Sequence, residues 1–148
     1  MRQYKKTTNK QLGQLLIERG VITHDQIETA ISTQKEKGGL IGELLVELKF
    51  ATEKDIAQAL TCQYGFPYLP LLSYEIDTEV LASVPEDMCL KNCVIPIDRI
   101  GKSLTVAMAN PLNFNVAIEI EQLTECTIQI FVSTPTDIKK SIAKYYTP

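Results

Sequence analysis

The chain has 148 residues, a net charge of −3 and a hydrophobic share of 45%. This size and composition are typical of one sizeable core or two small subdomains. The charge gives no electrostatic footprint for nucleic acid, and no apolar run approaches the roughly 20 residues of a transmembrane helix. We therefore predict a cytoplasmic protein with no nucleic-acid partner and no direct membrane insertion.

The cysteines do not suggest a metal site. Cys62, Cys89, Cys93 and Cys126 are accompanied by one histidine, and no second close pair of cysteines completes a tetrahedral set of ligands. In a reducing compartment these four residues are expected to be thiols. We therefore predict no metal.

Two stretches of the first half repeat each other. LGQLLIERGVITHDQIETAISTQ begins at Leu12, and IGELLVELKFATEKDIAQALTCQ begins at Ile41, with eight identities in 23 aligned positions. The apolar spacing in both is that of an amphipathic helix. An internal duplication at one constant offset predicts two helix-turn-helix units related by a pseudo-twofold axis.

Local signals mark the turn inside each repeat. Gly20 can adopt the left-handed conformation that commonly follows a helix. Thr23 and Gln26 have the spacing of a capping box, and Thr52 and Asp55 repeat it. A second helix is therefore expected to begin after each threonine.

The period changes after the YGFPYLPLL linker. Asp77 is expected to cap a short helix through Val84, and CVIPIDRIGKSLTVAMA predicts two strands joined by a turn at Gly101 and Lys102. NFNVAIEIEQLT predicts a helix, CTIQIFVS predicts a strand, and Pro135 can open a last helix. The fold class is thus α+β, with a four-helix tandem repeat followed by a small ββαβα part.

We expect three parts along the chain. Residues 1–10 carry four cations and no acid and are expected to form a flexible basic tail. Residues 11–66 form the helical tandem-repeat subdomain and residues 67–148 the α/β subdomain. We expect these two subdomains to make one compact unit.

No pattern in the chain indicates an enzyme. The GKS at Gly101 to Ser103 lacks the earlier glycine of a phosphate-binding loop, whose place is taken by Pro96, and it joins two strands. His24 stands alone in the first turn of a helix, where a solvated role is the simpler interpretation. We therefore predict a non-catalytic chain.

The duplicated glycines and glutamines allow two interpretations. Gly13 and Gly42 each lie near the start of a helix, where glycine costs about 1 kcal/mol relative to alanine. They permit either close helix packing or contact of the backbone with a flat ligand. Gln34 and Gln63 can cap a neighbouring helix or bind a base edge. A ligand with two similar halves, or a partner with its own symmetry, suits such a site.

The repeated stretches resemble the tandem 24-residue motif in the N-terminal domain of type II secretion and type IV pilus assembly ATPases. In the branch that binds cyclic di-GMP the motif is R-L-G-x-x-L-V-x-x-G-L-I-x₄-L-x₃-L-x₂-Q. The first copy matches it at Leu12, Gly13, Leu16, Ile17, Gly20, Val21, Ile22, Ile27, Ile31 and Gln34. The second matches at Ile41, Gly42, Leu45, Val46, Phe50, Ile56, Leu60 and Gln63.

The departures from the motif remove its charged groups. The arginine that opens each copy is Gln11 in the first and Leu40 in the second, and the glycine of the second copy is Lys49. Ala51 replaces a larger apolar residue, and Asn110 takes the place of an aspartate that the family has before a proline. Neither Gln11 nor Leu40 can offer a guanidinium to guanine or phosphate.

The resemblance implies a regulatory or adaptor domain that docks on the cytoplasmic part of an inner-membrane assembly protein. A C-terminal or separate ATPase domain is the other expected partner, and the location would be cytoplasmic and peripheral to the inner membrane. The alternative is a cyclic di-GMP sensor. The residues that the resemblance assigns to its dinucleotide site are Gln11, Leu12, Gly13, Leu16, Gly20, Gln34, Ile41, Gly42, Leu45, Gln63 and Asn110.

Overall fold

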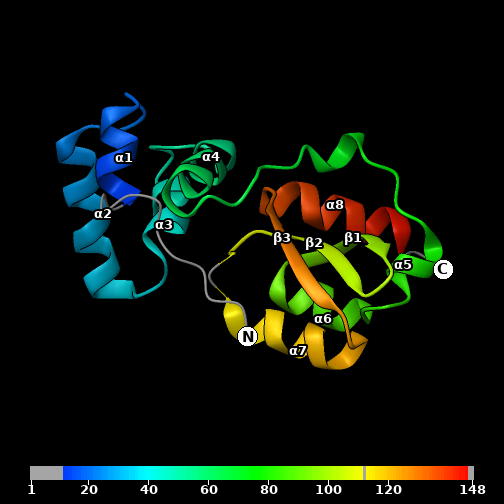
Figure 1. Cartoon of the computed structure of the whole chain (residues 1–148). Coiled ribbons are helices and arrows are strands. Elements are labelled where there is room, and N and C mark those ends of the chain that lie inside the picture. The colour runs from blue at the N-terminus through cyan, green and yellow to red at the C-terminus, as the bar shows by residue number, and fades with distance from the viewer. Residues whose placement is uncertain (1–11, 112, 147–148) are drawn as a thin grey trace. The chain divides into compact units, whose positions relative to one another are not determined.

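The computed structural model describes residues 12–111 and 113–146. It divides into two compact units, one ending at Gly65 and one beginning at Phe66. The elements of both units can be followed in Figure 1. The expectation that the two units form one compact body stays a prediction, as does the flexible tail at residues 1–10, which lie outside the described part of the chain.

The described part of the first unit, residues 12–65, contains four helices, as the repeat predicts. They are α1 (Leu12–Glu18), α2 (His24–Lys37), α3 (Ile41–Glu47) and α4 (Glu53–Tyr64). α1 packs mainly against α4, and α2 packs mainly against α3. Each helix of one repeat therefore buries its apolar stripe against a helix of the other repeat.

The second unit is built on a three-stranded sheet. Its elements are η1 (Leu71–Ser73), α5 (Thr78–Leu81), α6 (Glu86–Asn92), β1 (Val94–Ile100), β2 (Ser103–Met108), α7 (Phe114–Thr124), β3 (Thr127–Val132) and α8 (Pro135–Tyr145). β1 and β2 form an antiparallel hairpin, and β2 pairs with β3 in parallel through the α7 crossover. The predicted α+β class and the ββαβα order are confirmed.

The sheet buries one apolar row of side chains in register. Leu104 lies opposite Ile128, Val106 lies opposite Ile130, and Met108 lies opposite Val132 in the parallel ladder. All six of these side chains are buried. Alternation with period two therefore places them on one face of the sheet, where they form the core of the α/β unit.

Two details between the linker and the sheet differ from expectation. The helix expected from Asp77 to Val84 is the single turn α5, because the chain tightens after it through a hydrogen bond from Ser83 N to the Val80 carbonyl. α6 was not predicted. It begins directly after Pro85 and has two acidic residues in its first turn. Its buried residue is Cys89, so its sequence lacks the periodic apolar stripe by which an amphipathic helix is predicted.

Tyr146, at the end of α8, makes hydrogen bonds to the segment that contains α5 and α6. Its hydroxyl lies 3.0 Å from each of the Leu81 and Val84 carbonyl oxygens and 3.4 Å from Cys89 Sγ. Burial raises the pKa of the Tyr146 hydroxyl, and it raises the pKa of the Cys89 thiol to about 11. Both groups are therefore neutral donors and acceptors in the core.

We expect Tyr146→Phe to lower the free energy of unfolding of the α/β unit by about 1–3 kcal/mol, because it removes the one hydroxyl hydrogen that the Leu81 and Val84 carbonyl oxygens share. Urea denaturation followed by circular dichroism measures this. Tyr74→Phe is the matched control, because Tyr74 contributes its backbone carbonyl, which accepts from Tyr145, and this carbonyl is kept. Equal stability of Tyr146→Phe and the natural chain would contradict the assignment.

Candidate functional site

The duplicated motif forms one pseudo-symmetric core. Its buried members are three pairs at equivalent places in the two repeats: Leu16 with Leu45, Ile22 with Ala51, and Ala30 with Ala59. Leu12 and Ile41 are partly buried and pack against this cluster. Four of the predicted site residues, Leu12, Leu16, Ile41 and Leu45, are thus parts of this core or pack against it.

The first helix of each repeat ends in the same Schellman motif. Gly20 N donates to the Ile17 carbonyl at 3.0 Å and Val21 N to the Leu16 carbonyl at 2.9 Å. In the second repeat Lys49 N and Phe50 N make the equivalent bonds, at 3.0 and 2.9 Å. The φ angles of Gly20 and Lys49 are 75° and 63°. Lys49 therefore occupies a left-handed conformation that favours glycine.

Both predicted capping boxes are present. Gln26 N donates to Thr23 Oγ1 at 3.2 Å, and Thr23 N donates back to Gln26 Oε1 at 2.9 Å. Asp55 N and Thr52 N make the same reciprocal pair, at 3.1 and 3.0 Å. These bonds satisfy the first free N–H groups of α2 and α4 and define where both helices begin.

The duplicated glycines make room for isoleucines. A Cβ built on Gly13 would lie 2.8 Å from Ile27 Cδ1, and a Cβ built on Gly42 would lie 3.0 Å from Ile56 Cγ2. The Cβ built on Gly42 would also lie 3.4 Å from Leu12 Cδ2. Both glycines are therefore explained by close packing between the two helices of a repeat.

The two glutamines differ in their surroundings. Gln34 is half-buried, and its Nε2 donates to the Gly39 carbonyl at 3.0 Å. Gln63 is 5% exposed, and no buried side-chain nitrogen or oxygen of the described residues lacks a hydrogen-bond partner. The equivalent amides of the two repeats thus face different environments.

The remaining predicted site residues do not form one described cluster. Gln11 lies outside the described residues. Asn110 belongs to the α/β unit, where it is half-buried after β2 and its carbonyl accepts from Asn113 N at 3.1 Å. That these residues bind a ligand together with the repeats stays a prediction.

Leu40 stands where the motif has its second arginine. It is the N-cap residue of α3, it makes no capping bond with its side chain, and it is 50% exposed. Ile31, another position of the motif, is 41% exposed. In the described helical unit these are the two large hydrophobic side chains that remain exposed. At Leu40 the chain thus presents apolar surface where the motif has a charge, and Ile31 adds a second exposed apolar side chain.

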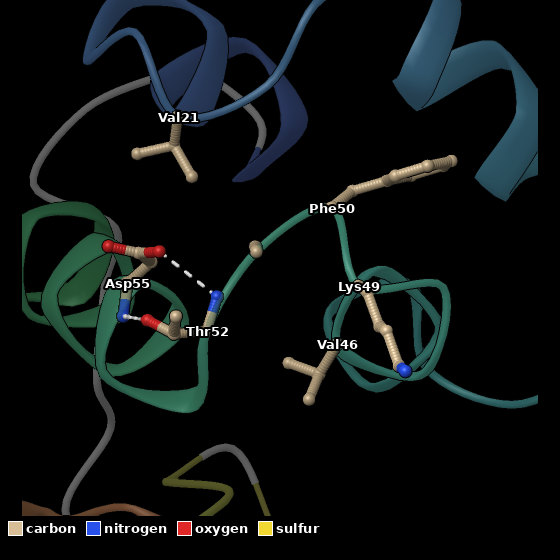
Figure 2. Close-up of a pocket in the computed structure, with 7 residues that line it drawn as sticks. Val21, Val46, Lys49, Phe50, Thr52 and Asp55 are labelled. Atoms are coloured by element: carbon tan, nitrogen blue, oxygen red, sulfur yellow. Dashed lines mark hydrogen bonds between the residues drawn. The ribbon is translucent and has the colours of Figure 1, made fainter.

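An open pocket of about 480 Å³ lies beside the turn of the second repeat. Its walls are Val21, Val46, Lys49, Phe50, Ala51, Thr52 and Asp55. Figure 2 shows Val21 facing this turn from the first repeat, and the Thr52–Asp55 capping bonds crossing one wall. The walls therefore combine apolar side chains with polar groups, among them the exposed cation Lys49 and the half-buried carboxylate of Asp55.

None of the residues that the resemblance assigns to the dinucleotide site lines this pocket. The signal that pointed nearest to it was the replacement of the motif glycine by Lys49. Elsewhere in residues 12–111 and 113–146, no group of histidine, cysteine or acidic side chains has the arrangement of a metal site. None of the helices in this part combines the length and apolar character needed to cross a membrane.

The described elements form a module with a helical tandem repeat and a small mixed sheet, and the comparisons with known proteins give this module a family. The model of the MshEN domain matches residues 64–148, which is more than half of the chain. The chain therefore belongs to the MshEN domain family, as an N-terminal domain of the kind found in type II secretion and type IV pilus assembly ATPases.

Curated relatives align over both units. The type IV pilus assembly ATPase PilB of Myxococcus xanthus is 31% identical over 135 residues, which are 91% of this chain and 24% of PilB. PilB of Thermus thermophilus is 29% identical over 140 residues, 93% of this chain and 16% of that protein. The chain thus spans at most a quarter of these relatives. Residues 64–148 match the MshEN domain, and the 148 residues hold no complete phosphate-binding loop.

Two solved structures share the fold. The structure of MshE with cdg has a TM-score of 0.80 at 24% identity, covering 93% of this chain and all of that one. The N-terminal domain of XpsE has a TM-score of 0.73 at 18% identity, covering 98% of this chain and 99% of that one. The predicted resemblance to secretion and pilus ATPase N-terminal domains is confirmed.

We expect Lys49→Gly to stabilise the helical unit by about 1 kcal/mol, because it relieves the left-handed strain of roughly 1–2 kcal/mol but adds glycine's backbone entropy. Gly20→Lys is the matched control at the equivalent turn, where no atom lies within 4 Å of a built Cβ. It should destabilise by a similar amount. Thermal denaturation of both variants measures this pair, and changes of the same sign would contradict it.

Proposed function

We infer that this chain is a non-catalytic regulatory and docking domain of a secretion or pilus assembly ATPase, which binds the cytoplasmic part of an inner-membrane assembly protein. The observation that carries this is the half-exposed Leu40 at the position of the motif arginine. Through such a partner the domain would work at the cytoplasmic face of the inner membrane. The ATPase motor would lie in another part of the same protein or in a separate chain.

Contacts that the motif residues make within the helical unit support this proposal. Gly13 and Gly42 receive isoleucine side chains, Gln34 bonds to the Gly39 carbonyl, and Gln63 is buried. These features first suggested a duplicated ligand site, yet each has a role inside the helical unit. The motif can therefore persist as a scaffold whether or not it binds a nucleotide.

The surface chemistry favours a protein partner. Exposed apolar side chains such as Leu40 and Ile31 gain free energy when a partner covers them. A nucleotide instead requires charged donors, and each one lost costs roughly 1.5–3 kcal/mol, or about ten- to a hundredfold in affinity. With Gln11 and Leu40 in place of two arginines, the balance moves from nucleotide to protein.

The docking test is a titration of the chain with the purified cytoplasmic domain of the inner-membrane assembly protein from the same system. Leu40→Arg should weaken this binding at least tenfold, because it places a charge in the apolar contact. Leu72→Arg is the matched control, since Leu72 is 55% exposed in the α/β unit. Equal effects of the two variants, or no binding by the natural chain, would count against the proposal.

A second candidate function is binding of cyclic di-GMP. It is favoured by the structural similarity to MshE, which was solved with cdg. In this proposal the paired repeats would hold the two halves of the dinucleotide, with the partly exposed Leu12 and Ile41 supplying the apolar floor and the buried Leu16 and Leu45 supporting it from the core.

Calorimetric titration with cyclic di-GMP, with GTP as control, separates the two candidates. We expect no heat from the natural chain at low micromolar ligand, and measurable binding by a Gln11→Arg/Leu40→Arg variant if the apolar floor is intact. Low-micromolar binding by the natural chain would replace the docking proposal with a sensor. If neither the natural chain nor the variant released or absorbed heat on titration, the apolar floor itself would no longer fit a dinucleotide.

A further inference from the structure

The helical unit has the design of a two-fold dimer whose two members are joined in one chain. One member is the hairpin of α1 and α2, and the other is the hairpin of α3 and α4. The core between them consists of equivalent residues, as the pair Leu16 and Leu45 shows. An interface in which both partners use the same residues is self-complementary, as in a symmetric homodimer.

Each hairpin depends on the other hairpin for burial. The main helix contacts run between repeats, from α1 to α4 and from α2 to α3. Within a hairpin, the approach of Ile27 to Gly13, or of Ile56 to Gly42, joins the two helices. A hairpin separated from its partner would therefore expose its leucine stripe to water.

The link between the hairpins is short and held by few bonds. Gly38 and Gly39 are exposed, with φ angles of 76° and 94°, and no atom lies within 4 Å of a Cβ built on either. Gly38 N donates to the Gln34 carbonyl at 2.7 Å, and Gln34 Nε2 donates to the Gly39 carbonyl at 3.0 Å. An extended conformation of these two glycines would release α3 from the α2 of its own chain.

We propose that the partner fitted by this self-complementary surface is a second copy of the chain, with which it exchanges one hairpin. In the exchanged dimer, α1 and α2 of one copy pack against α3 and α4 of the other, through the same contacts as in the single chain. Opening of the Gly38–Gly39 link is the conformational cost, so protein concentration and link length set the balance.

The exchange changes which chain supplies each copy of the duplicated motif. In the single chain both copies of the motif come from one molecule. In the dimer, each complete motif pair takes its first copy from one chain and its second from the other, and two such pairs are formed. The inference is independent of the ligand or partner that the motif binds.

Complementation between two variants, each with a substitution that disrupts one hairpin, tests the exchange. Leu16→Asp destroys the first hairpin's share of the core and leaves the second hairpin intact, whereas Leu45→Asp does the opposite. With one variant labelled with ¹⁵N so that the two equal masses can be distinguished, the refolded mixture should contain a one-to-one heterodimer by native mass spectrometry. It should also show more helical circular dichroism than the average of the two variants measured separately. A mixture that contains no heterodimer overturns the proposal.

A hinge series supplies a second test that keeps every core residue. Deleting Gly38 and Gly39 leaves one residue between α2 and α3, too short to cross the about 8–10 Å between packed helices. This variant should elute at twice the mass of one chain, and inserting Gly-Ser-Gly-Ser between the two glycines should give a monomer. A folded monomer from the deletion variant overturns the proposal even if the aspartate variants aggregate.

Discussion

Short helices that cannot stand alone are the constraint on which the helical unit depends. α1 and α3 have seven residues each, far below the roughly 12–15 at which an isolated helix becomes marginally stable in water. They persist because Leu16 and Leu45 are fully buried in a cluster drawn from both repeats. The Schellman turns and capping boxes set the angle between the two helices of each repeat, so that both leucine stripes meet in that cluster. The duplication therefore builds a core that neither half could build by itself.

This constraint separates the motif from its ligand. Ile27 and Ile56 lie in the space beside Gly13 and Gly42, where a Cβ would fit only if these isoleucine side chains shifted, and this holds with or without a nucleotide. Leu40, at a position where the motif has an arginine that could grip a charged ligand, is by contrast the N-cap residue of α3 and is 50% exposed. Selection for the fold alone would keep the apolar and glycine positions and leave the arginine positions free to change. The losses of arginine at Gln11 and Leu40 follow that division, whereas Lys49 and Ala51 change a glycine position and an apolar position of the motif.

Much of the architecture could be predicted because its signals are local. The repeat offset, the capping pairs and the left-handed residue after α1 are all readable within a few positions, and the ββαβα order followed from the change of period. α6 and the Tyr146 hydrogen bonds could not be predicted, since one lacks a periodic stripe and the other joins residues more than 60 positions apart. For the site, the loss of arginine was visible in the sequence. The pocket beside Lys49 was not, because it depends on Val21 from the other repeat.

The helical unit is symmetric in its packing and asymmetric in its chemistry. The buried pairs match across the repeats, but Gln34 is half-buried while Gln63 is buried, and a neutral turn at Gly20 corresponds to a cation at Lys49. A ligand with two equal halves gains affinity by making the same contacts in both repeats. Each difference between equivalent residues therefore removes a contact from one half of such a ligand. A protein partner has no symmetry to satisfy and can use the two sides differently. The asymmetry of the surface therefore favours a protein over a symmetric small ligand, while the symmetric core is what a second copy of the chain would recognise.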